Sequence, residues 1–218
     1  MTAERLTNAL QHRLEALYDL DLPAQVADHV FSDAELARRL RGSGQRQARE
    51  QLLVQQGGDE LSLSLYLDRA LLEPLIERNP LRAFELELLD AFAAVIEGVS
   101  HFVCVVWHAL HERPCTQLEL ELQAEVDKFA LLHQLWREQR ADSPQPLLAC
   151  LFEHISFERG LDAVESERYR LASHYAARYC GSMQQRFQGR LDHPQARTQL
   201  RRFYRSPQTE KLRCAVSM

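Results

Sequence analysis

The sequence of 218 residues predicts a mainly α-helical protein, a compact bundle of about five to seven helices with one small β-hairpin packed on it. Long segments carry apolar residues at steps of three and four, which is typical of helices that bury one face. One short segment alternates apolar and polar residues instead. Hydrophobic residues make up 45% of the chain, with only eight Gly and eight Pro. This composition is that of a globular protein, and we expect a single domain over residues 1–218.

Helix signals follow one another along the chain. We expect helices over about 3–17, 33–41, 80–111, 116–137, 147–159 and 162–190, and a short helical turn over 24–29. Ser32 with Glu35, and Thr116 with Glu119, form capping boxes that mark two of the starts. Asn79, followed by a proline, predicts the start of the 80–111 helix. Because this helix is apolar on nearly every side, we place it at the centre of the bundle.

The strand signal is confined to residues 50–67. Leucines at every second position of its second half form one face, and the residues at 57–59 provide a turn; these leucines are Leu61, Leu63, Leu65 and Leu67. An isolated hairpin is marginal in water, so the leucine face should pack on the helices. Pro74 then restricts where the next helix can begin, because its ring does not fit deep inside a helix.

A membrane span and an exported protein are both disfavoured. Residues 91–110 approach the length of a membrane span but include Glu97, His101 and His108, which are costly in lipid, so a buried core helix is favoured. The first 20 residues lack the apolar stretch of a signal peptide. We therefore expect a cytoplasmic protein without a membrane partner.

The five cysteines are odd in number and contain no C-x-x-C pair, so neither a disulfide framework nor a thiolate zinc site is predicted. Cys104 and Cys180 lie among apolar residues of predicted helices and are interpreted as inert core thiols. The sequence also lacks G-x-S-x-G, a P-loop and a Gly-rich nucleotide motif.

Candidate metal ligands share one narrow stripe of the 80–111 helix, formed by Asp90, Glu97, His101 and His108. A Glu and a His four residues apart can both reach one metal ion. Two further pairs lie on other predicted helices, and the full candidate set is Glu97, His101, Glu121, Glu125, His154 and Glu158. If these faces converge, they suit a first-row transition metal inside a helical bundle. The spacing lacks the repeated Glu-x-x-His of ferritin-like proteins, so no resemblance to them is claimed.

The same residues also fit a purely structural interpretation. The stripe can be the one solvent-facing side of a central helix, or Glu97 and His101 can be a hydrogen-bonded pair. Glu121 and Glu125, with Lys128 at helical spacing, would then form a solvated ion-pair face.

Positive charge gathers in the C-terminal segment. The chain has a net charge of −5, yet residues 168–218 hold 11 basic and 2 acidic side chains. The candidate partner-binding residues of this segment are Arg186, Arg190, Arg197, Arg201, Arg202, Phe203, Tyr204 and Arg205. They favour an acidic protein partner, while the acidity of the whole chain argues against a dedicated nucleic-acid binder. Alternatively, the segment lies across the acidic body of the same chain.

Two functions from different classes follow from these observations. The favoured one is a non-enzymatic interaction or regulatory protein that uses the arginine-rich C-terminal surface. The alternative is a helical carboxylate and histidine metalloprotein or metalloenzyme centred on Glu97 and His101. The sequence does not show whether the protein is an enzyme, and it identifies no substrate. It is also compatible with a homo-oligomer.

Overall fold

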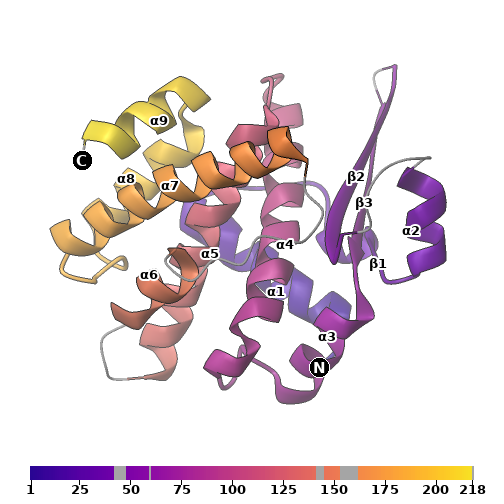
Figure 1. Cartoon of the computed structure of the whole chain (residues 1–218), viewed down its shortest axis with the longest axis horizontal. Helices are drawn as coiled ribbons and strands as arrows, with labels where there is room; N and C mark the ends of the chain where they lie inside the picture. Colours follow the sequence, from indigo (N-terminus) through magenta and orange to yellow (C-terminus); the bar gives the residue numbers. More distant parts are fainter. Residues whose placement is uncertain (42–47, 59, 141–144, 153–161, 218) are drawn as a thin grey trace.

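The computed structural model describes residues 1–41, 48–58, 60–140, 145–152 and 162–217. Over these residues, nine α-helices form a bundle and a three-stranded sheet lies on one side of it (Figure 1). The predicted mainly α fold with a packed hairpin is therefore confirmed. The described part of the chain has more helices than predicted, together with an additional strand.

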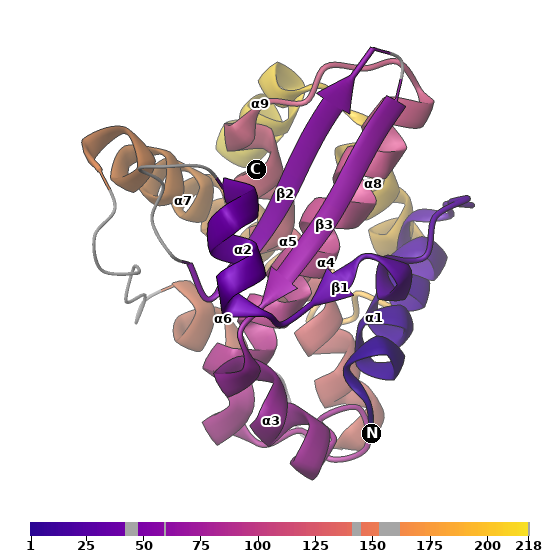
Figure 2. The ribbon, with the colours of Figure 1, turned by 90° about the vertical axis from the view of Figure 1, so that its right-hand side faces the viewer.

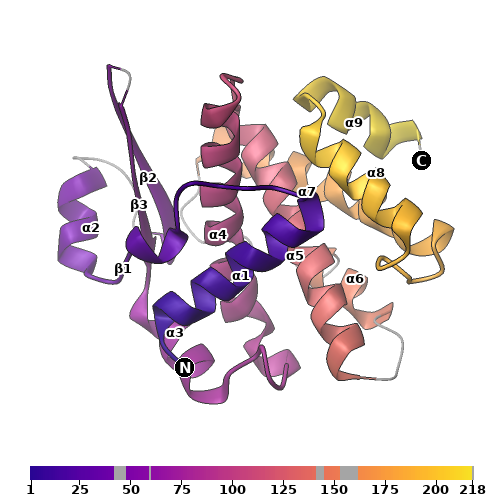
Figure 3. The ribbon, with the colours of Figure 1, turned by 180° about the vertical axis from the view of Figure 1, so that it is seen from behind.

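Two long helices form the centre of the molecule. Helix α4 (Leu89–Leu110) packs along α5 (Gln117–Gln139), and α7 (Ala163–Arg186) crosses α5 on one side (Figure 1). On the opposite side, α1 (Ala3–Tyr18) lies across the pair (Figure 3). The larger apolar side chains in the middle of α4, from Phe92 to Trp107, are mostly buried, so its role as the central helix is as predicted.

The start of the central helix differs from the prediction. Asn79 does not cap a helix at residue 80 but ends α3 (Arg69–Arg78), with a left-handed φ of 49° and its N–H donating to the carbonyl of Leu75. Asparagine tolerates this conformation, which commonly ends helices. A loop and a 3-10 turn (Leu86–Leu88) follow, so α4 begins nine residues later than predicted.

Proline and capping residues explain two smaller differences. Pro74 lies inside α3, so the helix continues through the proline at the loss of one backbone donor. Helix α2 (Ala34–Arg41) is capped by Asp33, whose carboxylate accepts from the backbone N–H groups of Glu35 and Leu36 at 2.9 and 3.0 Å. The expected cap, Ser32, lies one residue too early.

The hairpin is confirmed and is part of a mixed sheet. Strands β2 (Glu50–Gly57) and β3 (Glu60–Leu67) pair antiparallel, and β1 (Val30–Phe31) pairs parallel to β3 on its other side. The strand order is β1-β3-β2 (Figure 2). Strand β1 was not predicted because two residues are too few to show an alternating pattern.

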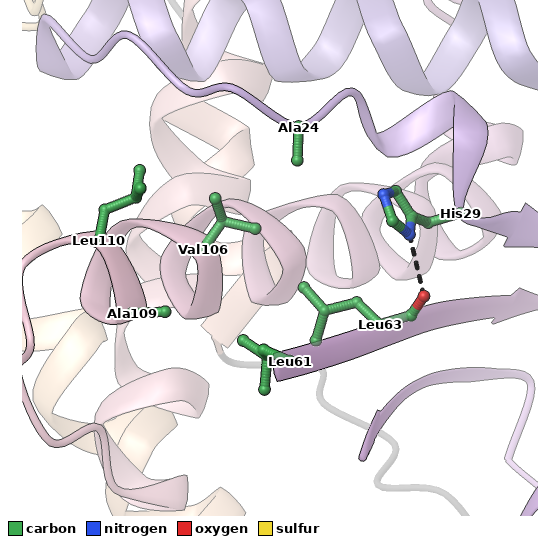
Figure 4. A pocket seen from close by; sticks show the side chains of 7 residues that line it. All are labelled: Ala24, His29, Leu61, Leu63, Val106, Ala109 and Leu110. Atoms are coloured by element: carbon green, nitrogen blue, oxygen red, sulfur yellow. Dashed lines mark hydrogen bonds between the residues drawn. The ribbon is translucent and has the colours of Figure 1, made fainter. Parts of the chain in front are cut away.

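The alternating leucines face the helices as expected. Leu63, Leu65 and Leu67 are buried, whereas Leu61 near the tip of the hairpin is 38% exposed. Beside it, an apolar pocket lies between the hairpin and the end of α4, and its lining residues are Ala24, His29, Leu61, Leu63, Val106, Ala109 and Leu110 (Figure 4). The ring of His29 borders this pocket and donates from Nδ1 to the carbonyl of Leu63 at 2.9 Å.

Beyond α7, which corresponds to the predicted helix over 162–190, the C-terminal segment folds into two helices that were not predicted. Helix α7 ends at Arg186, and α8 (Pro194–Arg205) and α9 (Gln208–Ser217) follow it. Buried residues at helical spacing give α8 its core face; these are Ala196, Leu200, Phe203 and Tyr204. The many arginines between them concealed this pattern. Helix α6 (Gln145–Phe152) begins close to the predicted position, and residues 153–159 of that predicted helix lie outside the described ones.

One described segment, Leu86–Leu110, is long and apolar enough to cross a membrane. Its most apolar window is 61% buried within the fold, mostly against other helices and the hairpin. This burial fits the predicted core helix.

The two faces of β3 predict different effects of the same charge. Leu65→Asp places a carboxylate at a position that is 0% exposed, and we expect it to lower the free energy of unfolding by roughly 3 kcal/mol or more. Ser62→Asp introduces the same charge at an exposed position of the same strand and should cost less than about 1 kcal/mol. Urea denaturation of both variants measures the difference. Equal losses would show that the assignment of faces is wrong.

Candidate metal centre

Three of the predicted metal ligands come together where α4 meets α5. Glu97 and His101 lie one turn apart on α4, and Glu121 reaches them from α5. One ligand atom from each of these residues lies within 4.8 Å of the others. The predicted polar faces of α4 and α5 therefore meet at these three residues.

His101 lies between two carboxylates. Its Nδ1 is 3.5 Å from Oε1 of Glu50 at the start of β2, and its Nε2 is 3.4 Å from Oε2 of Glu121. Burial disfavours the charged ring, but Glu121 and Glu50 outweigh burial and raise the pKa of His101 well above its usual value. The side chain therefore holds its extra proton strongly, and this proton occupies a position that a cation could take.

Gly98 lets the hairpin approach α4 at this point. A Cβ atom on Gly98 would lie 2.8 Å from Cγ and 2.9 Å from Oε1 of Glu50, and 2.9 Å from a methyl group of Leu65. Any larger residue would force the side chains of Glu50 and Leu65 to move. The close contact places the carboxylate of Glu50 beside His101.

Lys128 forms the second half of the cluster. Its Nζ donates to Oε2 of Glu97 at 2.8 Å and to Oε1 of Glu125 at 2.9 Å. Burial disfavours the ammonium, but the two carboxylates outweigh burial and raise the pKa of Lys128 above its ordinary value. The predicted ion pairing is present, but the expected solvated face is wrong, because Lys128 is only 9% exposed.

Carboxylates outnumber permanent cations in the described part of this cluster. Among the described residues, Lys128 and Arg168 form ion pairs with them, and Nε of Arg168 lies 3.9 Å from Oε1 of Glu121. Arg49, which pairs with Asp90, also interacts electrostatically with Glu97. The four carboxylates are Glu50, Glu97, Glu121 and Glu125. Burial, opposed by His101, raises the pKa of Glu50 to about 7. A proton on Glu50 or His101 therefore compensates part of the negative charge.

The remaining predicted ligands are placed elsewhere. Glu125 is engaged by Lys128 and does not belong to the group of three. Asp90, from the same stripe of α4, is exposed and pairs with Arg49 at 2.5 Å. The predicted pair of His154 and Glu158 lies outside the described residues.

Glu50 and Arg168 were not predicted as members of this cluster. They lie on β2 and α7, far from α4 in sequence, and reach it only through tertiary packing. The one local signal was Gly98, because a glycine inside a helix often marks a close approach of another segment.

The aromatic residues proposed to bind a partner belong to the core. Phe203 is 2% exposed and stacks on Tyr179 with ring centroids 4.0 Å apart, and Tyr204 is 1% exposed and stacks on Tyr18 at 4.3 Å. The prediction that these two rings bind a partner is therefore wrong. In this fold their rings hold α8 against α7 and α1.

The predicted arginines divide into two groups. Two of them donate to backbone carbonyls at the end of α1. Nε of Arg201 donates to the carbonyl of Leu17 at 3.0 Å, and Nη2 of Arg205 donates to the carbonyl of Asp19 at 2.9 Å. The others are exposed, and they are Arg186, Arg190, Arg197 and Arg202. Part of the basic segment thus lies against its own chain, and part remains on the surface.

Comparison of the chain with protein-family models, with curated proteins and with solved structures found no match.

The buried ion pairs of Lys128 predict a large and pH-dependent contribution to stability. Lys128→Met leaves the carboxylates of Glu97 and Glu125 without their cation and should lower the free energy of unfolding by about 3 to 5 kcal/mol at pH 8. Burial raises the pKa of Glu97, but Lys128 outweighs burial and holds it below its ordinary 4.5. The contribution is therefore complete above that value and is lost as the pH falls through the lowered pKa.

Urea denaturation between pH 8 and pH 3 measures this effect, and the gap between wild type and Lys128→Met should narrow below about pH 4.5. Arg170→Met is the matched control, because its ion pair with Glu167 is exposed, and it should cost less than about 1 kcal/mol. A small, pH-independent loss in Lys128→Met would contradict the buried pairing.

Proposed function

We propose that the chain is a metal-binding helical protein that holds one divalent first-row ion between α4 and α5. The ligands are Glu97, Nε2 of His101 and Glu121. The observation that carries this proposal is the surplus of largely buried carboxylates in the described part of the cluster, where Glu50, Glu97, Glu121 and Glu125 form ion pairs with the permanent cations Lys128 and Arg168 and with His101. A divalent cation balances that surplus, and it takes the place of the proton on His101.

The donor set favours Mn²⁺ or Fe²⁺. Carboxylate oxygens suit Mn²⁺, and a mixture of imidazole and carboxylate suits non-haem iron. Glu50 supports the same role, because a histidine that binds a metal through Nε2 usually donates its Nδ1–H to a carboxylate. Oε1 of Glu50 lies 3.5 Å from that nitrogen, in the position of such a partner.

Three protein ligands leave coordination positions for water or for an oxygen of a substrate. The side chain of Glu97 is 19% exposed, so the centre is not sealed from solvent. An ion held in this way can lower the pKa of a bound water or polarise a substrate oxygen. The proposal therefore includes metal-dependent catalysis, with the reacting oxygen bound to the ion.

Manganese binding tests this function directly. Wild-type protein titrated with Mn²⁺ should remove one equivalent from the EPR signal of the free ion, and Glu97→Gln or His101→Gln should abolish this binding. Affinity should fall as the pH is lowered, because Mn²⁺ competes with the proton that His101 holds strongly. A chelator should lower the melting temperature of the metal-loaded wild type to that of the metal-free protein.

Glu125→Gln is the control variant. It removes a carboxylate of the same buried cluster that pairs with Lys128 but is not one of the three ligands, so stoichiometric Mn²⁺ binding should remain. A folded wild type that binds neither Mn²⁺ nor Fe²⁺ overturns the proposal. Equal loss of binding in all three variants would also contradict the assigned ligands.

We propose a second candidate function, binding of an acidic protein partner through the exposed arginines of the C-terminal segment. The observation in its favour is that Arg186, Arg190, Arg197 and Arg202 remain exposed although neighbouring arginines bind α1. This surface is smaller than the sequence suggested, because its aromatic residues are buried.

Polyglutamate provides a probe for this second function. Wild-type protein should bind it with an affinity that falls as salt is raised, and the double change Arg197→Glu and Arg202→Glu should weaken binding at least about tenfold. The same change of net charge on α2, Arg38→Glu with Arg39→Glu, serves as the control and should have little effect. Binding that is absent in the wild type, or lost equally in both double variants, would contradict this function.

A further inference from the structure

A second group of metal-binding side chains lies at the other end of α4. Cys104 and His108 are one turn apart on this helix, and Cys115 immediately precedes Thr116, the N-cap of α5. One ligand atom from each of Cys104, His108 and Cys115 lies within 4.8 Å of the others. The turn between α4 and α5 therefore brings two thiols and an imidazole together.

The ring of His108 is oriented for binding a cation. Its Nδ1 lies 3.2 Å from the carbonyl oxygen of Pro114, and because a carbonyl only accepts, Nδ1 carries the proton. In the neutral ring, Nε2 then has a lone pair that is available to a cation. This nitrogen is buried, has no hydrogen-bond partner, and lies 3.7 Å from Oε1 of Glu119. Such a pairing of two electron-rich atoms is unfavourable unless a proton or a metal lies between them.

The thiols of Cys104 and Cys115 are close enough to interact with each other. A hydrogen bond from Cys104, opposed by burial and aided by His108, lowers the pKa of Cys115 to about 5. The pKa of Cys104 is raised by its bond to Cys115 and by burial, so the two sulfurs share one proton. The start of α5 also favours a thiolate, because backbone N–H groups point out of it.

Glu119 and Lys211 complete the surroundings. Glu119 is 3% exposed, and its side chain does not return to the helix start as a capping box requires; Oε1 instead lies 3.0 Å from Nζ of Lys211. Lys211 comes from α9, is 0% exposed and lies over the rings of Phe203 and Tyr204. A fully buried ammonium requires negative charge beside it.

We propose that Cys104, His108, Cys115 and Glu119 form a binding site for Zn²⁺ that is separate from the carboxylate centre. Two thiolates and an imidazole are the donors that zinc prefers, and a closed set of four is typical of a structural zinc site. Donors on one tetrahedral zinc lie roughly 3.3 to 3.8 Å apart. The 3.7 Å between His108 and Glu119 fits this range. The ligand atoms of Cys104, His108 and Cys115 lie within 4.8 Å of one another and would have to move closer by up to about 1 Å.

The charges of this site balance. Zinc with two thiolates, a carboxylate and a neutral imidazole carries a net charge of −1, which the ammonium of Lys211 neutralises. The ion joins the end of α4 to the start of α5, and Lys211 links the site to α9. Its role is therefore to hold the turn between the two central helices, whereas the carboxylate centre leaves open positions for chemistry.

Cobalt substitution and thiol protection test this site in the full chain under reducing conditions. Co²⁺ should produce a thiolate charge-transfer band that Zn²⁺ displaces, and Cys115→Ser or His108→Gln should weaken Zn²⁺ binding at least about 100-fold. Cys214→Ser is the control, because Cys214 is a cysteine of similar exposure on α9. Glu97→Gln should leave the band unchanged, which separates this site from the carboxylate centre.

Alkylation of the wild type keeps the test independent of variants that fail to fold. Zn²⁺ should protect Cys115 from alkylation, as read by mass spectrometry, while Cys214, which has similar exposure, reacts as before. A folded, reduced wild type without the band or the protection overturns the proposal, as does a band that survives Cys115→Ser. A disulfide between Cys104 and Cys115 that forms in place of zinc binding would overturn it as well.

Discussion

The packing of α5 against α4 depends on the neutralisation of charged side chains that the two helices bury between them. Each buried charge costs several kcal/mol unless a partner compensates for it. Lys128 provides that compensation for Glu97 and Glu125, while His101 does so for Glu50 and Glu121. The apolar sides of α4 supply the driving force for packing the helices together, and the ion pairs determine how α4 and α5 are placed relative to each other.

The positions of lysine reflect the same constraint. The chain has only two lysines among its 26 basic residues, and both are buried, with Lys128 at 9% and Lys211 at 0% exposure. An ammonium is a compact point charge that can approach one or two carboxylates in a narrow space, whereas a guanidinium is wide and planar. Arginine supplies the surface charge of this protein, and lysine occurs where the helices leave little room.

Sequence patterns predicted the elements well and the contacts between them only in part. The leucine alternation defined the hairpin, and the polar stripe of α4 placed Glu97 and His101 together, because both depend on local periodicity. Glu121 and Glu125 share one face of α5, yet one approaches His101 and the other Lys128, a distinction that only the placement of neighbouring helices makes. The cysteine and histidine cluster was missed because its spacing is irregular. Two of its members flank a turn whose conformation brings Cys115 back to Cys104.

The carbonyl groups at the end of α1 are bound by Arg201 and Arg205, and the first of these contacts joins residues that are 184 positions apart. The apolar face of α1 also packs on α4 and α8, which are both synthesised later. Contacts of such long sequence separation form slowly, since a long loop must close before they contribute. During translation, α1 therefore emerges before its partners and stays incomplete, with an exposed leucine face, until α8 has been made. A chaperone that covers that face would have to remain bound until α8 has emerged.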